Sequence, residues 1–259
     1  MTSADRSALL GLEFKRERLA AIVARCLAWT RQPRRSHIVV TANASHLCMM
    51  RRDAVLRDAC RAADMAVADG MSVVWALRAL GRPLPERVAG VDLITSLLAA
   101  GSTERLRVYL LGARQEVLDA LVAECGRRYP GVVIAGSRNG YFKADDHLSI
   151  VEEIRASEPD MLFVGMPSPF KDVFCQRHRD RLNVPVIVGV GGSFDVLAGF
   201  IRRAPKAVQM VGLEWAWRLM KEPRKLWKRY LTTNTEFIWL VLREAWRSRA
   251  GLRAPHSDS

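Results

Sequence analysis

The chain has 259 residues, of which 49% are hydrophobic, so it can bury one sizeable core and carry a smaller appendage. Its 40 Lys and Arg residues against 27 Asp and Glu residues give a net charge of +13, which favours an anionic partner such as a membrane face or a nucleic-acid backbone. No apolar run approaches the roughly 20 residues that a membrane-spanning helix needs, and the charged N-terminal segment lacks the apolar core of a signal peptide. Five scattered cysteines, never spaced C-x-x-C, argue against a disulfide framework and favour reduced thiols in the cytoplasm.

Short runs of β-branched and apolar residues alternate with helix-length segments through the first 200 residues. Buried strands are predicted over 37–40, 106–111, 132–135, 161–164 and 186–190, with helices such as 115–129 and 145–157 between them. This alternation predicts an α/β fold, a Rossmann-like layered parallel sheet flanked by helices. Functional sites in such folds lie beyond the carboxyl ends of the strands, so the polar residues that follow each run are the candidates.

The pattern changes after about residue 205, where only helical segments are predicted. Residues 200–259 hold 13 basic residues, 5 acidic residues and five of the seven tryptophans. We therefore predict an α/β core over 1–205 and a basic, tryptophan-rich helical appendage over 206–259. This composition suits the headgroup layer of an anionic membrane; the alternative is a solvated basic helix packed on the core through its aromatic face. The predicted apolar face of the appendage contains Trp227, Leu231, Ile238, Val241, Leu242 and Ala245.

Three polar clusters follow apolar runs and are expected to meet at one edge of the sheet. Thr41 and Asn43 follow the first strand, Asp69 follows a short apolar run, and Arg87 and Asp92 come next along the chain. Each cluster by itself has a structural explanation. Thr41 and Asn43 suit a helix cap, Asp69 suits a turn, and Arg87 with Asp92 suits a salt bridge.

A glycine-rich turn follows the predicted strand at 186–190. Gly191 and Gly192 let backbone N–H groups approach a phosphate or a sugar, but the pattern G-x-G-G-S is not the G-x-G-x-x-G of a dinucleotide site. The chain has no P-loop, no pair of aspartates at D-x-D spacing and no histidines at ligand spacing. The sequence therefore predicts neither nucleoside triphosphate hydrolysis nor a metal site.

A series of short motifs runs in order along most of the chain. They are T-x-N at 41–43, A-D-x-x-x-x-D-G at 63–70, E-R-V-x-G-x-D-L at 86–93, L-L-G at 110–112, Y-P-G at 129–131, G-Y-F at 140–142, G-V-G-G-x-F-D-x-x-A-G at 189–199, R-A-P at 203–205, G-L-E-W-x-x-R-L at 212–219, and E-P followed by K-R-Y at 222–230. This order resembles the bacterial WecG/TagA/CpsF glycosyltransferase family over about residues 12–247.

The resemblance implies an inverting, metal-independent transferase that needs no cofactor. Such enzymes move a sugar from a UDP-sugar to an acceptor linked to undecaprenyl pyrophosphate, a polyprenyl pyrophosphate, at the inner face of the cytoplasmic membrane. Members transfer N-acetylmannosamine, its uronic acid or glucose in the synthesis of exopolysaccharide and other cell-surface polysaccharides. The donor, a hexose or N-acetylhexosamine, is open, as is whether the chain acts as a monomer or a homo-oligomer.

The resemblance also implies roles for particular residues. Asp69 would be the general base that takes the proton of the acceptor hydroxyl, and Thr41 and Asn43 would hold donor or acceptor hydroxyls. Without a metal, basic side chains and backbone N–H groups must meet the charge of the leaving diphosphate. The candidates for this and for the rest of the substrate site are Arg87, Gly90, Asp92, Gly112, Gly191, Gly192, Asp195, Arg218, Arg224 and Arg229.

One departure from the family pattern affects the choice of donor. Where the family usually has G-x-P-K-Q-E, this chain has Lys171 and Asp172 in place of Gln and Glu. A cation that only donates hydrogen bonds replaces an amide that both donates and accepts. If Lys171 contacts the donor, N-acetylmannosamine cannot be assumed, and a different hexose for an exopolysaccharide repeat is an equal alternative.

Two other functions are the alternatives. The net charge permits a nucleic-acid-binding protein, but the sequence has no recognisable binding motif, so no nucleic-acid partner is predicted. The second alternative is a non-catalytic scaffold of a polysaccharide assembly complex, which the complete T-x-N and D-G motifs disfavour.

Overall fold

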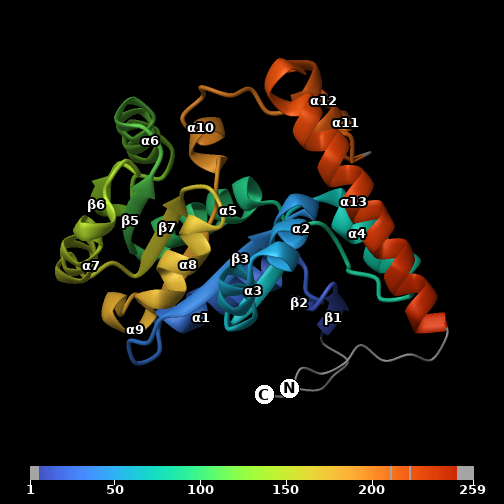
Figure 1. The fold of residues 1–259 in the computed structure, drawn as a ribbon. Helices are drawn as coiled ribbons and strands as arrows, with labels where there is room; N and C mark the ends of the chain where they lie inside the picture. The colour runs from blue at the N-terminus through green and yellow to red at the C-terminus, as the bar shows by residue number, and fades with distance from the viewer. Residues whose placement is uncertain (1–5, 211, 222, 250–259) are drawn as a thin grey trace.

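The computed structural model describes residues 6–210, 212–221 and 223–249, and it has the α/β architecture that the sequence predicts (Figure 1). A parallel sheet of six strands forms its centre, with the strand order β4-β3-β8-β7-β5-β6. Five of these strands overlap the predicted ones, so the fold class is confirmed. The strands are β3 (His37–Ala42), β4 (Met65–Ala68), β5 (Arg107–Gly112), β6 (Val133–Arg138), β7 (Met161–Gly165) and β8 (Val186–Gly189).

Helices cover both faces of the sheet, and each face has its own core. Successive strand residues point to opposite faces, so Val39 belongs to one core while Ile38 and Val40 belong to the other. The face with Ile38 is covered by α2 (Ala44–Arg52), α3 (Ala54–Arg61), α4 (Met71–Ala79), α7 (His147–Ala156), α8 (Phe170–Arg177) and α9 (Arg179–Leu182). The face with Val39 is covered by α1 (Leu19–Thr30), α5 (Gly90–Glu104), α6 (Gln115–Arg128) and α10 (Ser193–Leu197).

Three short strands are absent from the sequence prediction. One is β4, which has four residues, and the others are β1 (Arg6–Leu9) and β2 (Leu12–Lys15), which form an antiparallel hairpin. β1 and β2 contain charged residues and β4 is half alanine, so none of the three forms a continuous run of β-branched or large apolar residues. The short 3-10 helix Ala144–Asp146, which precedes α7, was also included in a longer predicted helix.

The C-terminal helices lie at the β4 end of the sheet, opposite α6 and α7 (Figure 1). They are α11 (Lys206–Met210), α12 (Glu214–Lys221) and α13 (Pro223–Arg249). Phe237 and Leu240 of α13 are buried in the core that also contains residues of α2. α13 therefore packs on this core. The division of the chain into two domains at residue 205 stays a prediction.

The face of α13 that meets the core matches the predicted apolar face only in part, because Val241 of that face packs against the core. Ile238 and Leu242, which the helical pattern groups on that face, are exposed together with Trp239 and Trp246. The side chains of Trp227 and Leu231 lie outside the described residues. Of the helices in the described ranges, none combines the length and the apolar character that crossing a bilayer demands.

Candidate active site

The carboxyl ends of β4, β3 and β8 lie next to one another at one edge of the sheet. Parallel pairing places Ala42 beside Ala68 and Val40 beside Gly189. The hydroxyl of Thr41 donates a hydrogen bond of 2.6 Å to the carbonyl oxygen of Gly189, which ties the ends of β3 and β8 together. The polar segments that follow these strands therefore converge, as the sequence predicts.

Asp69 stands directly after β4 and is oriented by backbone groups. Its N–H donates to the carbonyl of Ala42 at 2.9 Å, and its carboxylate Oδ1 accepts from the N–H of Gly90 at 2.8 Å. A Cβ at Gly90 would lie 3.1 Å from Ser193 Oγ and 3.7 Å from Thr41 Oγ1, so this corner is tightly packed. Asp69 itself is half-buried. A carboxylate oriented in this way can accept a proton from a hydroxyl that approaches the strand ends.

Thr41 and Asn43 occupy different positions with respect to solvent. Thr41 is buried, and its hydroxyl proton is committed to the carbonyl of Gly189. Asn43 is exposed and caps α2, because its Oδ1 accepts from the N–H of His46 at 3.1 Å. The capping role is therefore present, and the exposed amide N–H groups of Asn43 are the part of this motif that can meet a sugar hydroxyl.

The predicted glycine positions fall into two groups. Gly191 has a φ of 53°, and a Cβ at Gly192 would meet nothing within 4 Å, so the turn after β8 is open to a ligand. Gly112 ends β5, which is separated from β3 by β7 and β8. A Cβ there would lie 2.5 Å from the backbone of Gly165, so close packing of the two strands explains the glycine at position 112 without a ligand. Asp195 lies in the first turn of α10, which follows the Gly191 turn along the chain.

Arg87 and Asp92 belong to a network of four charged residues rather than to one salt bridge. Arg87 Nη1 lies 2.8 Å from Glu214 Oε2, while its Nη2 is 3.8 Å from Asp92 Oδ2. Both oxygens of Asp92 are taken by Arg203, at 2.5 and 2.7 Å. The hydrogen bonds to Asp92 raise the pKa of Arg203 above its ordinary value, so this guanidinium stays charged. Because Glu214 begins α12, the network joins the strand-end site to the C-terminal helices.

Lys171 lies beneath the strand ends and is not open to solvent. Its Nζ is 2.5 Å from Asp172 Oδ1, and both residues are 4% exposed. A Cβ at Gly189 would lie 3.1 Å from Lys171 Nζ, so the ammonium packs against the end of β8. The Oδ2 atom of Asp172 accepts from Ser168 Oγ at 2.6 Å. Lys171 and Asp172 therefore form a buried ion pair.

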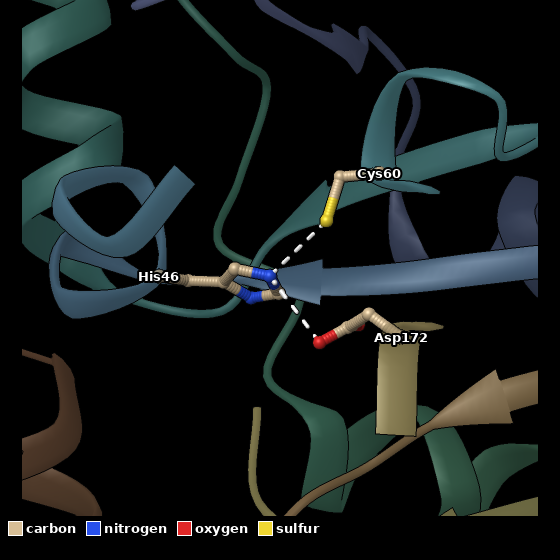
Figure 2. A group of neighbouring side chains, drawn as sticks. All are labelled: His46, Cys60 and Asp172. Atoms are coloured by element: carbon tan, nitrogen blue, oxygen red, sulfur yellow. Dashed lines mark hydrogen bonds and ion pairs between the residues drawn. The ribbon is translucent and has the colours of Figure 1, made fainter. Parts of the chain in front are cut away.

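His46 and Cys60 complete this buried cluster, and neither was singled out in the sequence (Figure 2). His46 Nε2 lies 3.2 Å from Cys60 Sγ and 3.5 Å from Asp172 Oδ2. Burial lowers the pKa of His46 to about 4 and raises the pKa of the Cys60 thiol to about 12. Burial opposes ionisation of Asp172 most strongly of any single influence, but the charges of Lys171 and His46 and the hydrogen bonds from Lys171 and Ser168 together hold the pKa of Asp172 below its ordinary value.

The atoms of His46, Cys60 and Asp172 lie within 4.8 Å of one another, close enough to hold a metal ion. The charge of the cluster does not call for one. Lys171 already neutralises Asp172, and a divalent cation would add two positive charges beside a buried ammonium. The imidazole and the thiol already contact each other, with 3.2 Å between Nε2 of His46 and Sγ of Cys60. The absence of a metal from the enzyme stays a prediction.

Three predicted arginines cannot be placed at the site. Arg218, Arg224 and Arg229 belong to α12 and α13, but their side chains lie outside the described residues. Their assignment to substrate binding stays a prediction. Arg203 and Glu214, by contrast, were missed as site residues although both occur in the R-A-P and G-L-E-W motifs.

The fold is an α/β fold with a parallel sheet, and polar side chains gather where β4, β3 and β8 end. The family model described as the glycosyl transferase WecG/TagA/CpsF family matches residues 7–251, and the chain therefore belongs to this family. It is similar to the N-acetylglucosaminyldiphosphoundecaprenol N-acetyl-beta-D-mannosaminyltransferase of Bacillus spizizenii strain W23, with 38% identity over 181 residues, 70% of this chain and 69% of the relative. The protein of the same name from Bacillus subtilis strain 168 is 30% identical over 221 residues, 85% of each chain.

Proposed function

We propose that this glycosyltransferase moves a hexose or N-acetylhexosamine from a UDP-sugar to an acceptor linked to polyprenyl pyrophosphate, in cell-surface polysaccharide synthesis. The observation that carries the proposal is the Asp69 carboxylate, oriented by the Gly90 N–H at 2.8 Å where three strands end. The names of both Bacillus relatives describe transfer to an undecaprenyl-diphosphate-linked acceptor, which supports the class of acceptor proposed for this chain.

The proposed reaction is a single displacement. Asp69 removes the proton from the acceptor hydroxyl, whose oxygen forms a bond to the anomeric carbon as the bond from that carbon to the UDP oxygen breaks. Attack opposite the leaving group inverts the anomeric configuration. The leaving diphosphate needs positive charge and N–H donors, which Arg87 and the turn at Gly191 and Gly192 supply without a metal ion in this proposal. Asn43 is the proposed contact for a sugar hydroxyl.

The donor sugar is the part of the proposal that the buried ion pair affects. Lys171 is buried and its ammonium lies against Asp172 and Gly189, so its effect on the donor would pass through the position of the β8 end. N-acetylmannosamine, which the names of the relatives include, and glucose are therefore both kept as donors to be compared.

Membrane docking at the inner face of the cytoplasmic membrane is the second part of the proposal. Phe237 and Leu240 of α13 pack inward, while Trp239 and Trp246 are exposed. A solvated basic helix packed on the core through its tryptophans would bury Trp239 and Trp246 instead. Arg51 and Arg243 lie 5.6 and 5.4 Å from the Trp239 ring, so positive charge flanks the exposed indole. Exposed indoles beside cations suit an anionic headgroup layer.

Release of UDP tests the transfer. Purified protein is mixed with lipid-linked acceptor and with UDP-glucose, UDP-N-acetylglucosamine or UDP-N-acetylmannosamine, with and without chelator. Wild type should release UDP with one donor, and Asp69→Asn should lower the rate by about 10²–10⁴-fold, the usual contribution of a general base. Asp145→Asn, the same change at an exposed carboxylate, should leave the rate unchanged. Equal rates for Asp69→Asn and wild type would remove Asp69 from the mechanism. A folded protein that binds the acceptor but releases UDP from none of the donors would favour the scaffold alternative.

A further inference from the structure

Arg87, Asp92, Arg203 and Glu214 form the network of four charged residues, and the two arginines are paired to different extents. Arg203 holds both oxygens of Asp92 at 2.5 and 2.7 Å, a bidentate geometry, and its Nε lies 3.6 Å from Glu214 Oε1. Arg87 holds Glu214 through Nη1 at 2.8 Å, but its Nη2 reaches Asp92 only at 3.8 Å. Within the described residues, the acid that Nη2 of Arg87 reaches is therefore a distant one, which another arginine already neutralises.

The Nη2 atom of Arg87 belongs to a segment that also contributes to the strand-end site. Arg87 lies three residues before Gly90, whose N–H binds the Asp69 carboxylate. Asp92 lies two residues after Gly90 in the same segment. The side chains of Arg87 and Glu214 are 12% and 16% exposed, so the network sits in a partly dry environment, where charges act more strongly than in water. The Nη2 group of Arg87, beside the strand-end site, can therefore donate hydrogen bonds to an anionic ligand.

We infer that Arg203 is a positioning residue, which keeps Asp92 away from Arg87 so that Arg87 can bind the diphosphate group of a substrate. The inference rests on the proposed function for the role of Arg87. With Arg203 present, two arginines balance two carboxylates. Without it, Asp92 and Glu214 would both pair with Arg87, and the network would carry one net negative charge beside the diphosphate.

The magnitude follows from this change of charge. One unneutralised carboxylate about 6 Å from an anion, at an effective dielectric constant of about 40, weakens binding by about tenfold per unit of ligand charge. Screening by salt and solvent reduces this, so a loss of about ten- to thirtyfold in affinity for a diphosphate is expected.

The test compares three variants of the full chain. Arg203→Gln removes the charge that neutralises Asp92, and Arg202→Gln removes the same charge from the exposed neighbouring residue. Arg203→Gln combined with Asp92→Asn removes both members of the pair and restores the balance between Arg87 and Glu214. Thermal unfolding of each variant checks that it is folded.

Binding of inorganic pyrophosphate by calorimetry is the first readout, because it does not depend on sugar transfer. Arg203→Gln should bind pyrophosphate about ten- to thirtyfold more weakly than wild type, Arg202→Gln less than threefold more weakly, and the double variant within about threefold of wild type. In the transfer assay, Arg203→Gln should raise KM more than it lowers kcat.

A double variant no better than Arg203→Gln would overturn the inference, because a merely structural role is not rescued by removing Asp92. Wild type that binds no pyrophosphate would also overturn it. Wild type that binds pyrophosphate but transfers no sugar would instead reject the proposed function, and the binding comparison among the variants would still decide the role of Arg203.

Discussion

Lys171→Met should cause a large loss of stability, because it leaves a buried carboxylate without its cation. The ammonium of Lys171 is 2.5 Å from Asp172 Oδ1, and the two side chains are 4% and 2% exposed. After the substitution, Asp172 would keep the Ser168 hydroxyl at 2.6 Å and the His46 ring at 3.5 Å. Methionine has nearly the length of lysine, so little cavity forms. Removal of one member of a buried pair costs about 3–5 kcal/mol, a large part of the about 5–15 kcal/mol that holds a typical domain folded.

Urea unfolding followed by circular dichroism measures this loss. The matched control is Arg155→Met, which removes Arg155 from Glu152 on the surface, where the side chains are 58% and 47% exposed and less than about 1 kcal/mol is expected. Lys171→Met combined with Asp172→Asn removes both charges and should recover most of the loss. A loss below about 1 kcal/mol for Lys171→Met, or no recovery in the double variant, would refute the argument that an unpaired buried charge is responsible.

Three further outcomes are expected. Burial lowers the pKa of His46 to about 4, so between about pH 6.5 and pH 4 the unfolded chain takes up a proton that the folded chain does not. The free energy of unfolding should therefore fall by roughly 3 kcal/mol as the pH drops through this range. His46→Gln should flatten this dependence in unfolding curves, and an unchanged slope would contradict the prediction. Gly131→Ala should destabilise the fold strongly, because its Cβ would collide with the Ser102 carbonyl. Gly126→Ala lies inside α6, where its Cβ would meet nothing within 4 Å, and should stabilise the fold by about 0.5–1 kcal/mol. Thermal unfolding compares the two variants, and equal changes in stability would contradict the prediction. Trp246→Ala, at an exposed position of α13, should weaken sedimentation with vesicles that contain anionic lipid, and binding that is independent of this residue and of lipid charge would contradict membrane docking.

Much of the fold could be predicted because strands covered on both faces are continuous apolar runs. β8 is such a run, and so is β7, and the helices between them supply the second periodicity. β4 was missed because two of its four residues are alanine, which has little preference for strands. The apolar stripe of α13 was only partly right, since Val241 packs on the core while Ile238 and Leu242 are exposed. Helical spacing shows which residues share a face but not which partner that face meets.

The sequence by itself determined the α/β class, the family and the convergence of Thr41, Asn43 and Asp69, because parallel strands bring the residues after them to one edge. Only the tertiary structure decided how charges are paired. Arg203 meets Asp92 across 111 positions of the chain, and Arg87 meets Glu214 across 127. Local patterns carry no record of such distant partners, since they are chosen by the packing of whole helices against the sheet. The same packing buries Lys171 with Asp172 and turns Trp239 and Trp246 of α13 toward solvent.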